Sequence, residues 1–307
     1  MSQKENVNDI ASKTLTYNPL NEVKKYSPNI LVSIPRNLSI EYLGVKMEDL
    51  PGDGFDLWYN YEFRCLTNNG LPLASLIKFI FPHSTKNIIE SKSLKLYCNG
   101  FTTERLGNIK EEALSKACEI MKKDLSKMAE GNIDVSFLSY KSERNSVFET
   151  YKELTEIVDP KIKVDKYNED PSLLEVEESD SVNEYRFKFD ALRSKCRITK
   201  QPDTGTFYLY YKSKKHIKED SLVRYFSSFY EENHFHEEIL ITSFTRFSRL
   251  LNKDDELFTM GLYQRRGSLD IGPCHYKNLK SGSLEEDIIS KLKNPKVFVF
   301  DPNNLYR

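Results

Sequence analysis

An internal repeat limits what this chain can fold into more than any other feature of its sequence. Residues 93–101 align with residues 221–229, with serine, leucine, tyrosine and phenylalanine at identical spacing. A helical pattern follows both segments, and a stretch that runs from a cysteine to a proline precedes both, at residues 65–72 and 196–202. Because a repeated supersecondary unit packs against its own copy, we expect two copies of one strand–strand–helix–helix–strand–strand module.

Residue periodicity places strands and helices within these modules. Alternating or aromatic-rich stretches predict strands, and apolar residues spaced by three and four predict helices. The expected strands cover residues 57–66, 73–81, 185–189 and 206–211, and the expected helices cover residues 108–131, with Gly131 as the C-cap, and 236–251. The fold class is therefore α+β, with antiparallel sheets and paired helices on one face.

The same patterns divide the chain into an N-terminal module (1–140), a connector (141–183) and a C-terminal module (184–307). A mostly polar arm extends to about Asn29, and the acidic run at residues 175–180 predicts a solvated loop.

Composition narrows the class of partner. The 307 residues carry a net charge of -1, so the sequence indicates neither nucleic-acid binding nor attraction to an anionic membrane. The polar N-terminus lacks the apolar segment of a secretory signal, and no apolar run approaches the roughly 20 residues that span a bilayer. Five scattered cysteines favour reduced thiols over a disulfide framework. We expect a cytoplasmic protein that binds a small molecule.

The two copies differ in their polar residues. Asp203 follows a proline in the second copy, where Leu73 follows one in the first. Glu90 and Lys92 precede the first repeat, whereas His236 and Glu237 follow only the second. Two copies that share one composite site across their interface would differ in this way.

Cys196 is the candidate nucleophile. Most free cysteines are small buried hydrophobes, but Arg193, Lys195, Arg197 and Lys200 surround this one, and nearby cations favour the thiolate. Asp203 could return to the sulfur through a Gln-Pro turn and exchange protons with the reacting groups; alternatively, it only stabilises that turn.

Glu90 admits two interpretations. It could cap the helix that begins beside it, or its carboxylate could accept two N–H donors from a guanine-like edge. Both interpretations stay open on the sequence alone.

The segment Phe235-His236-Glu237 suggests a clamp for a planar heterocycle, with Phe235 as a stacking face. Together with His234, and with Cys274 or His275, it could instead hold a metal ion. We favour a site without metal.

Arg265-Arg266-Gly267 would suit a phosphate-bearing cofactor, because arginines bind phosphate and glycine permits close approach of the backbone. No Gly-x-Gly-x-x-Gly follows an expected strand, so a Rossmann domain is not expected.

These segments together resemble the two-module form of the NADPH-dependent 7-cyano-7-deazaguanine reductases, which are nitrile reductases of queuosine biosynthesis with the tunnelling fold. The resemblance rests on residues 90–97, 196–203, 235–237 and 265–271, and it extends to residues 34–38 and 43–44 near the start. It covers nearly the whole chain in order, and it implies two tandem tunnelling-fold modules, a homodimer, and NADPH as cofactor.

The resemblance also implies individual roles. Cys196 would attack the nitrile carbon to form a covalent thioimide, Asp203 would donate protons, and Glu90 and Glu237 would hold the deazaguanine ring. Further substrate contacts are implied for Ile89, Ser91, Phe235 and His236. Contacts with NADPH are implied for Ser91, Lys92, Arg265, Arg266 and Gly267.

Several residues depart from the family pattern. Arg197 stands where proline is common, Thr204-Gly205 replaces an aromatic-small pair, and Ser268 and Gly272 replace a glycine and an asparagine. These departures bear on loop geometry and rate, since none removes a chemical group named above. The alternatives are a tunnelling-fold protein that binds a purine-like or pterin-like ligand without chemistry, and a zinc-dependent hydrolase of the same fold.

Overall fold

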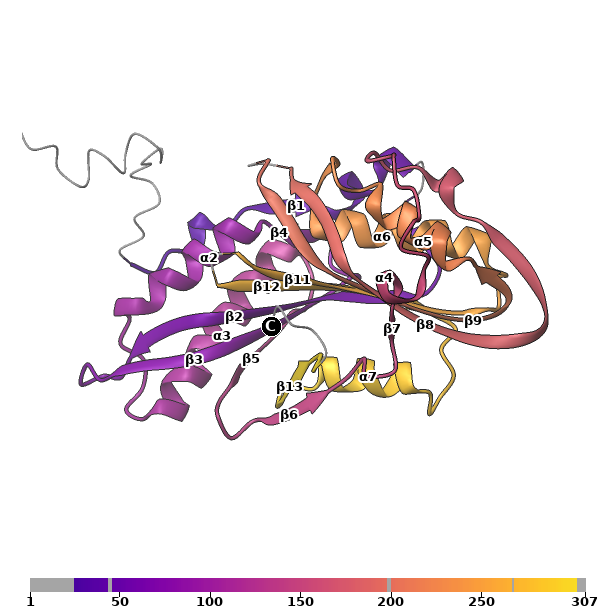
Figure 1. Ribbon diagram of the computed structural model, residues 1–307. Coiled ribbons are helices and arrows are strands. Elements are labelled where there is room, and N and C mark those ends of the chain that lie inside the picture. Colours follow the sequence, from indigo (N-terminus) through magenta and orange to yellow (C-terminus); the bar gives the residue numbers. More distant parts are fainter. Residues whose placement is uncertain (1–24, 44–45, 198–199, 267, 303–307) are drawn as a thin grey trace, which may run out of the picture.

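A nine-stranded sheet forms the centre of the molecule in the computed structural model, which describes residues 25–43, 46–197, 200–266 and 268–302. The strands follow the order β10-β8-β9-β11-β12-β2-β3-β5, with β7 beside β8 (Figure 1). The sheet is antiparallel except where the short β7 and β10 pair with β8. Its strands are β2 (Asp53–Leu66), β3 (Pro72–Pro82), β5 (Asp134–Leu138), β7 (Lys152–Glu153), β8 (Val176–Cys196), β9 (Pro202–Ile217), β10 (Asn233–His234), β11 (Glu256–Arg266) and β12 (Leu269–Lys277).

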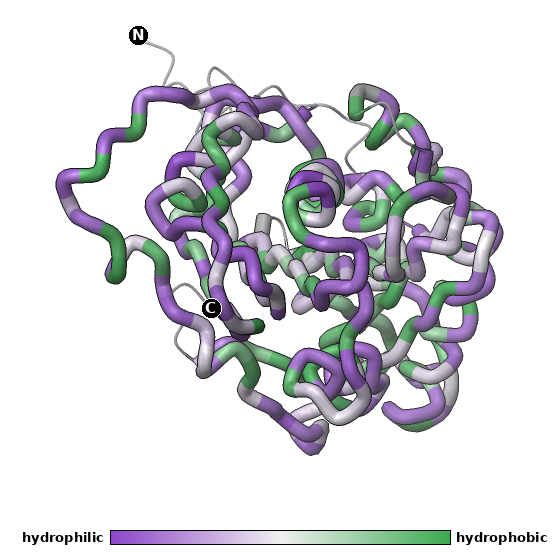
Figure 2. The backbone as a smooth tube through the Cα atoms, turned by 90° about the vertical axis from the view of Figure 1, so that its right-hand side faces the viewer, coloured by the Kyte–Doolittle hydropathy of each residue, from purple (hydrophilic) through white to green (hydrophobic). Residues whose placement is uncertain are grey.

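Two helix pairs cover one face of this sheet. Side chains that alternate along the strands face these helices in two clusters, one under each pair. The helices are α2 (Ser91–Asn99) and α3 (Lys110–Ala129) in the first half, and α5 (Glu219–Ser227) and α6 (His236–Leu250) in the second. They carry both hydrophilic and hydrophobic residues (Figure 2), as expected for helices with one buried side. The predicted α+β class with antiparallel pairing is therefore confirmed.

A further layer covers the opposite face, below the sheet in Figure 1. It consists of α7 (Leu284–Lys293) and a small parallel pair, β13 (Val297–Phe300) with β6 (Glu143–Ser146). Two short strands, β1 (Ser33–Pro35) and β4 (Asn87–Ile89), pair near the start of α2. The helix α4 (Leu154–Ile157) lies in the connector, and short 3-10 turns occur at Pro28–Ile30, Arg36–Ser39, Glu41–Leu43, Met47–Asp49, Gly100–Thr103 and Pro171–Leu173.

The sequence repeat is also a structural repeat. Helices α2 and α5 begin and end at equivalent residues, and the hydroxyl groups of Ser93 and Ser221 each donate to the backbone carbonyl three residues before, at 2.7 Å. The hairpins that precede them turn after Leu66 and after Cys196. The predicted helices at 108–131 and 236–251 are both confirmed to within two residues.

Two local predictions were wrong. Glu130, not Gly131, adopts the left-handed conformation that ends α3; Gly131 is needed because a Cβ there would lie 2.8 Å from Cγ2 of Thr85. The acidic run at 175–180 is not a loop: from Val176 onward it is the exposed end of β8, where Glu177 contacts His216 at 3.1 Å across the strand pair. Opposite charges on facing strands favour pairing there.

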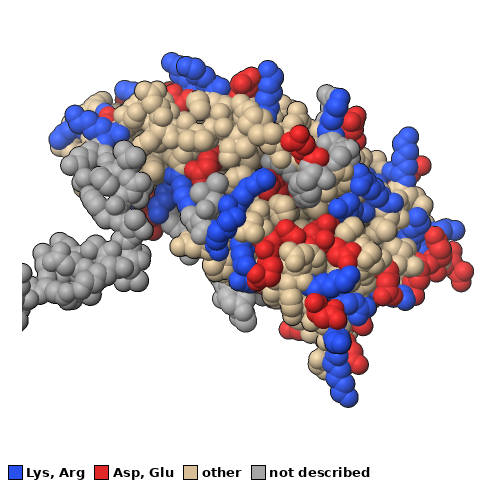
Figure 3. All heavy atoms as spheres, turned by 90° about the horizontal axis from the view of Figure 1, so that it is seen from above, with Lys and Arg blue, Asp and Glu red and all other residues tan. Residues whose placement is uncertain are grey.

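The two halves are joined by one antiparallel strand pair, β12 with β2, which runs from Leu269 opposite Asn60 to Tyr276 opposite Asp53. Acidic and basic side chains are interspersed on the face shown in Figure 3, in keeping with the net charge of -1. Among the described residues, no helix is both long enough and apolar enough to cross a membrane.

Candidate active site

A pocket lies between the two helix pairs, over the junction of β12 and β2. It holds about 400 Å³ of empty space, including its mouth. Apolar side chains from both halves form much of its wall: Ile34, Trp58, Ile88, Ile89, Phe235 and Ile271. Its polar lining comprises Glu90 and Ser91 from the first half and Cys196, Asp203, His236 and Glu237 from the second. The structure thus brings all eight predicted catalytic and substrate-binding residues to one pocket.

Cys196 ends strand β8 at this pocket and is buried, with 8% of its surface exposed. Its backbone N–H donates to the carbonyl of Gln201 at 2.8 Å, and its carbonyl accepts from Lys200 at 2.9 Å. On its other side, β8 pairs with β10, which places His234 opposite Cys196. The backbone of Cys196 is therefore held by hydrogen bonds within its hairpin and by the pairing of β8 with β10.

The cations around Cys196 do not form the purely positive environment that the sequence predicted. Arg193 and Lys195 both pair with Glu231, and Arg197 pairs with Glu238. The charges of these three residues are offset locally, so the sequence argument for a thiolate stabilised by several free cations is weakened.

Asp203 lies next to His236 at the mouth of the pocket. The Asp203 carboxylate Oδ2 is 3.5 Å from His236 Nε2, and its side chain is only 5% exposed. The His236 ring packs on the Tyr263 ring, with centroids 4.2 Å apart. The close approach of β9 and β11 depends on Gly205, because a Cβ there would lie 2.7 Å from the carbonyl oxygen of Leu262. Asp203 and His236 could together exchange protons with a bound ligand.

Glu237 lies at the inner end of the pocket and is almost fully buried. Burial, followed by the nearby charge of Asp56, raises its pKa from 4.5 to about 7, while His236 acts in the opposite direction. Near neutral pH this carboxyl group can therefore change its charge.

A second, smaller cavity lies behind Glu237, which lines both it and the pocket. Its buried polar groups are linked: Asp56 accepts from Arg36 at 2.8 Å, and its other oxygen lies 3.1 Å from His83 Nε2. His83 in turn packs against the ring of His275, at 4.2 Å between centroids. Arg36 and His83 hold the pKa of Asp56 well below its usual range, although burial alone would raise it.

Glu90 is a helix cap in this structure and also lines the pocket. It is the N-cap of α2, where its two carboxylate oxygens accept the backbone N–H groups of Lys92 at 3.1 Å and Ser93 at 2.8 Å. From this position Glu90 can both cap the helix and contact a ligand in the pocket. An N–H donor on a ligand would share the carboxylate with the helix end, since each oxygen has a second lone pair.

A wider groove, of about 1160 Å³ including open solvent, adjoins the pocket and shares Ser91, Asp203, His236 and Ile271 with it. Lys92, Lys95 and Asn99 line it from α2, and Gln201, Tyr263 and Gln264 line it from the second half. Of the predicted cofactor residues, Ser91 and Lys92 border this groove. Arg265 and Arg266 lie at the end of β11, and Gly267 lies outside the described residues.

The alternative metal shell is not assembled. His234 contacts Glu238 and Glu232, His236 faces Asp203, and His275 packs against His83. Within the ranges that the structure describes, no three His, Cys, Asp or Glu side chains are grouped so as to hold a metal ion.

The other four cysteines, all buried and free, have thiols with raised pKa values. Burial raises the pKa of Cys98 and of Cys118 to about 12, and that of Cys65 and Cys274 in the same direction. None of these four lines the pocket. Cys196 is therefore the cysteine available for chemistry there.

Sequence reasoning missed several residues around the site. Trp58 and Ile271 form part of the pocket wall, Tyr263 supports His236, and Asp56 with Arg36 lies behind Glu237. Arg36 and Ile271 lie in segments that carry the family resemblance, but no role followed from it for either of them. Asp56, Trp58 and Tyr263 lie within strands far apart in the sequence, where no local motif marks them.

The site has the features of an enzyme for a small planar ligand: a cysteine and a carboxylic acid in an apolar pocket, with a long groove alongside. Two family models match the chain, "Nitrile reductase, 7-cyano-7-deazaguanine-reductase N-term" over residues 22–137 and "QueF-like protein" over residues 202–281.

Curated proteins named "NADPH-dependent 7-cyano-7-deazaguanine reductase" are similar over most of the chain. The protein from Coxiella burnetii is 34% identical over 256 residues, which cover 83% of this chain and 88% of the relative. Those from Colwellia psychrerythraea and Hahella chejuensis are 33% and 37% identical, over 83% and 81% of this chain and 88% of each relative. The chain belongs to the 7-cyano-7-deazaguanine reductase family.

Proposed function

We propose that this protein reduces the nitrile of 7-cyano-7-deazaguanine to an aminomethyl group with NADPH, through a covalent intermediate on Cys196. The observation that supports this most strongly is the composite pocket, in which Cys196 and Asp203 of the second half lie with Glu90 and Ser91 of the first. A binder without chemistry would have no use for a cysteine and an acid in one apolar pocket.

The covalent step balances without an added reactant. The Cys196 sulfur adds to the nitrile carbon, one π bond of the C≡N group breaks, and the thiol proton moves to the nitrile nitrogen, which gives a thioimide. Asp203 is the carboxyl group placed to carry that proton, and His236, 3.5 Å from it, can exchange protons with it. When bound, NADPH supplies a hydride to the carbon in each of two reductions.

Residues of the protein supply the protons for both reductions and retain the imine that forms between them. Each reduction also consumes one proton, which Asp203 and His236 can replace from solvent through the adjoining groove. Departure of the Cys196 sulfur after the first reduction leaves an imine, which water would hydrolyse. The apolar wall with Trp58, Ile89 and Ile271 keeps that imine from water until it is reduced.

Recognition of the ring rests on two carboxylates and an aromatic face. Glu237 at the inner end and Glu90 at the helix end accept N–H groups of the deazaguanine, and Phe235 packs on its plane. Ile89, Ser91 and His236 complete the contacts. The raised pKa of Glu237 makes this recognition depend on pH, because only the ionised carboxylate accepts two N–H donors.

The groove beside the pocket has the charge that a dinucleotide requires. Lys92 and Lys95 place positive charge along it, and Asp203 and His236, beside which reduction takes place, line it as well. Ser91, Lys92, Arg265, Arg266 and Gly267 would hold NADPH there. We also infer that the two halves are tandem tunnelling-fold modules, and that the protein acts in the cytoplasm as a homodimer.

Intact-mass measurement after mixing with 7-cyano-7-deazaguanine in the absence of NADPH tests the covalent step. The wild-type protein should gain the mass of one substrate molecule, and Cys196→Ala should neither gain it nor oxidise NADPH when both reactants are present. Cys65→Ala is the matched control, because Cys65 is the penultimate residue of the equivalent strand of the first half, and Leu73 stands there where Asp203 stands in the second half. Nitrile reduction by Cys196→Ala at a comparable rate would exclude the thioimide.

A further inference from the structure

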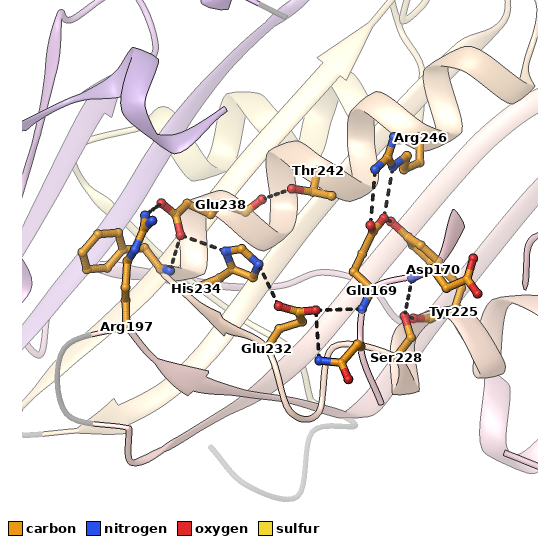
Figure 4. A network of polar contacts seen from close by, with 12 residues as sticks. Glu169, Asp170, Arg197, Tyr225, Ser228, Glu232, His234, Glu238, Thr242 and Arg246 are labelled. Carbon is orange, nitrogen blue, oxygen red and sulfur yellow. Dashed lines mark hydrogen bonds and ion pairs between the residues drawn. The ribbon is translucent and has the colours of Figure 1, made fainter. Parts of the chain in front are cut away.

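Arg197 directly follows the proposed nucleophile, and its side chain, which does not itself line the pocket, contacts the beginning of helix α6. Its Nη1 pairs with Glu238 Oε1, as the dashed line in Figure 4 shows. The guanidinium also lies 5.9 Å from the centre of the Phe235 ring, within the range of a cation–π contact. Glu238 is the residue after Glu237, so this ion pair connects the strand end that carries the thiol to the helix that carries the substrate carboxylate.

Glu238 is a buried junction of three elements. Its side chain is 1% exposed, and its Oε2 accepts the backbone N–H of Phe235 at 2.8 Å while lying 3.1 Å from His234 Nδ1. The first of these bonds caps the N-terminus of α6, directly before His236. Glu238 therefore holds the beginning of the helix on which His236 and Glu237 are carried.

The network continues away from the pocket and is anchored at its far end. His234 Nε2 lies 3.3 Å from Glu232, whose other carboxylate oxygen accepts the backbone N–H of Glu169 at 3.0 Å. Glu169 pairs with Arg246 of α6 at 3.1 Å (Figure 4). Because α6 is fixed through Glu169 at one end and Glu238 at the other, it is a firm support to which Arg197 can tie the strand end.

We propose that Arg197 is a positioning residue for the reaction of Cys196, whose thiol it holds in register with His236 and Glu237 through its ion pair with Glu238. This rests on the proposed role of Cys196 as nucleophile. The backbone of Cys196 bonds to Gln201 and Lys200 within its own hairpin, and β8 also pairs with β10 at His234. Arg197 adds a side-chain tie from this strand end to α6.

A different role for the same charge would be to stabilise the thiolate, and the two roles have separable consequences. A positioning residue changes the rate of attack at every pH, because a displacement of about 1 Å can lower a rate by roughly 100-fold. A residue that acts on thiol ionisation changes the pH at which the rate rises, and it leaves the rate at high pH unchanged. Glu238 largely neutralises Arg197, which favours the first role.

Lys195 provides a matched control. It is a cation on the other side of Cys196, it also pairs with a glutamate, Glu231, and its side chain is 27% exposed. Glu231 is not a residue of α6 and does not line the pocket. Replacement of Lys195 therefore removes a neighbouring positive charge without removing a side-chain tie to α6.

The test compares Arg197→Met, Arg197→Lys and Lys195→Met in single-turnover formation of the adduct with 7-cyano-7-deazaguanine, from pH 6 to pH 9. Arg197→Met should form the adduct about 10- to 100-fold more slowly at saturating substrate and at every pH. Its substrate affinity should change by less than about threefold, since Glu90 and Glu237 are untouched. Arg197→Lys should recover most of the rate, and Lys195→Met should resemble the wild type.

Iodoacetamide alkylation of Cys196, followed by peptide mass analysis, reports thiol ionisation without the substrate, and its pH dependence should be the same in all four proteins. Equal loss of adduct rate in Arg197→Met and Lys195→Met, or full recovery of the Arg197→Met rate at pH 9, would overturn the proposal.

A double-mutant cycle that combines Arg197→Met with Glu238→Gln gives a second measurement, which compares the double variant with the two single variants. The two losses in adduct rate should be clearly less than additive, because both substitutions break the same pair; additive losses would contradict the proposal. Failure of the wild-type protein to form any adduct would instead refute the proposed function, so the two failures are distinguishable.

Discussion

Replacement of Glu237 by glutamine should stabilise the folded protein, although Glu237 is needed for substrate recognition. The carboxyl group is almost fully buried, and burial and Asp56 raise its pKa from 4.5 to about 7. A raised pKa for an acid means that the folded state binds the proton more tightly than the unfolded state. Ionisation of Glu237 therefore costs folding free energy as the pH rises from about 4.5 through 7.

The size of this cost follows from the shift. One pKa unit corresponds to about 1.36 kcal/mol, so the full shift is worth on the order of 3 kcal/mol above pH 7, and less than about 1 kcal/mol of it is present at pH 5. Glutamine has nearly the same shape and does not ionise. Glu237→Gln should therefore be more stable than the wild type by about 3 kcal/mol at pH 8, and by less than about 1 kcal/mol at pH 5.

Urea unfolding of both proteins at pH 5 and pH 8 measures this difference directly, because the free energy of unfolding is read from the midpoint and slope. The slopes should be equal, and only the midpoint at pH 8 should separate the two proteins. An equal gain at both pH values would show that the pKa of Glu237 is not shifted, and a loss at pH 8 would show that Glu237 is stabilised as a carboxylate. Either result would refute the reasoning.

Two further predictions concern the chemistry and the composite pocket. Asp203→Asn should bind 7-cyano-7-deazaguanine but lose turnover, because the amide keeps the size of the acid and lacks its titratable proton; wild-type turnover in steady-state kinetics would reassign Asp203 to the turn. Glu90→Gln and Glu237→Gln should each weaken substrate binding by roughly 1.5–3 kcal/mol, the range for a hydrogen bond to a charged group, and the double variant should depart from additivity in titration calorimetry because both residues hold one rigid ring. Simple addition of the two losses would mean that the carboxylates act on the substrate independently.

The sequence was sufficient to predict the arrangement of the repeated elements. The spacing in residues 93–101 and 221–229 predicted equivalent helices, and α2 and α5 do begin and end at equivalent residues. Local patterns were sufficient because each helix buries a stripe of its own residues against the sheet. The asymmetry between the copies likewise indicated one shared pocket. Of the polar residues that only one copy carries, Glu90, Asp203, His236 and Glu237 do line it together, whereas Lys92 lines the adjoining groove.

The errors arose where contacts distant in the sequence outweigh local composition. An acidic run is typical of a loop, but residues 176–180 continue β8 because basic residues of β9 lie opposite. Gly131 is typical of a left-handed C-cap, but Glu130 takes that conformation and the glycine makes room for Thr85.

The electrostatics of the site were the least predictable part. Four cations near Cys196 in the sequence suggested a positive environment, yet three of them pair with Glu231 and Glu238, which come from a turn and a helix more than thirty residues later. The pairing of Asp56 with Arg36 and His83, which sets the surroundings of Glu237, joins three separate segments in the same way. The net charge near a site depends on which acidic and basic side chains the fold brings together there, and this could not be predicted from the single sequence.

The position of strand β12 has a consequence for synthesis of the protein on the ribosome. β2 is made early, but its partner β12 lies near the end of the chain, with Leu269 opposite Asn60. At about 5–20 residues per second, the edge of β2 stays without this partner for roughly 10–40 s after it is made. During that time the nascent chain presents an open strand edge of the kind that invites pairing with other chains. Slower translation of the second half would lengthen this period, and would be expected to increase aggregation of the nascent protein even though the finished sheet is unchanged.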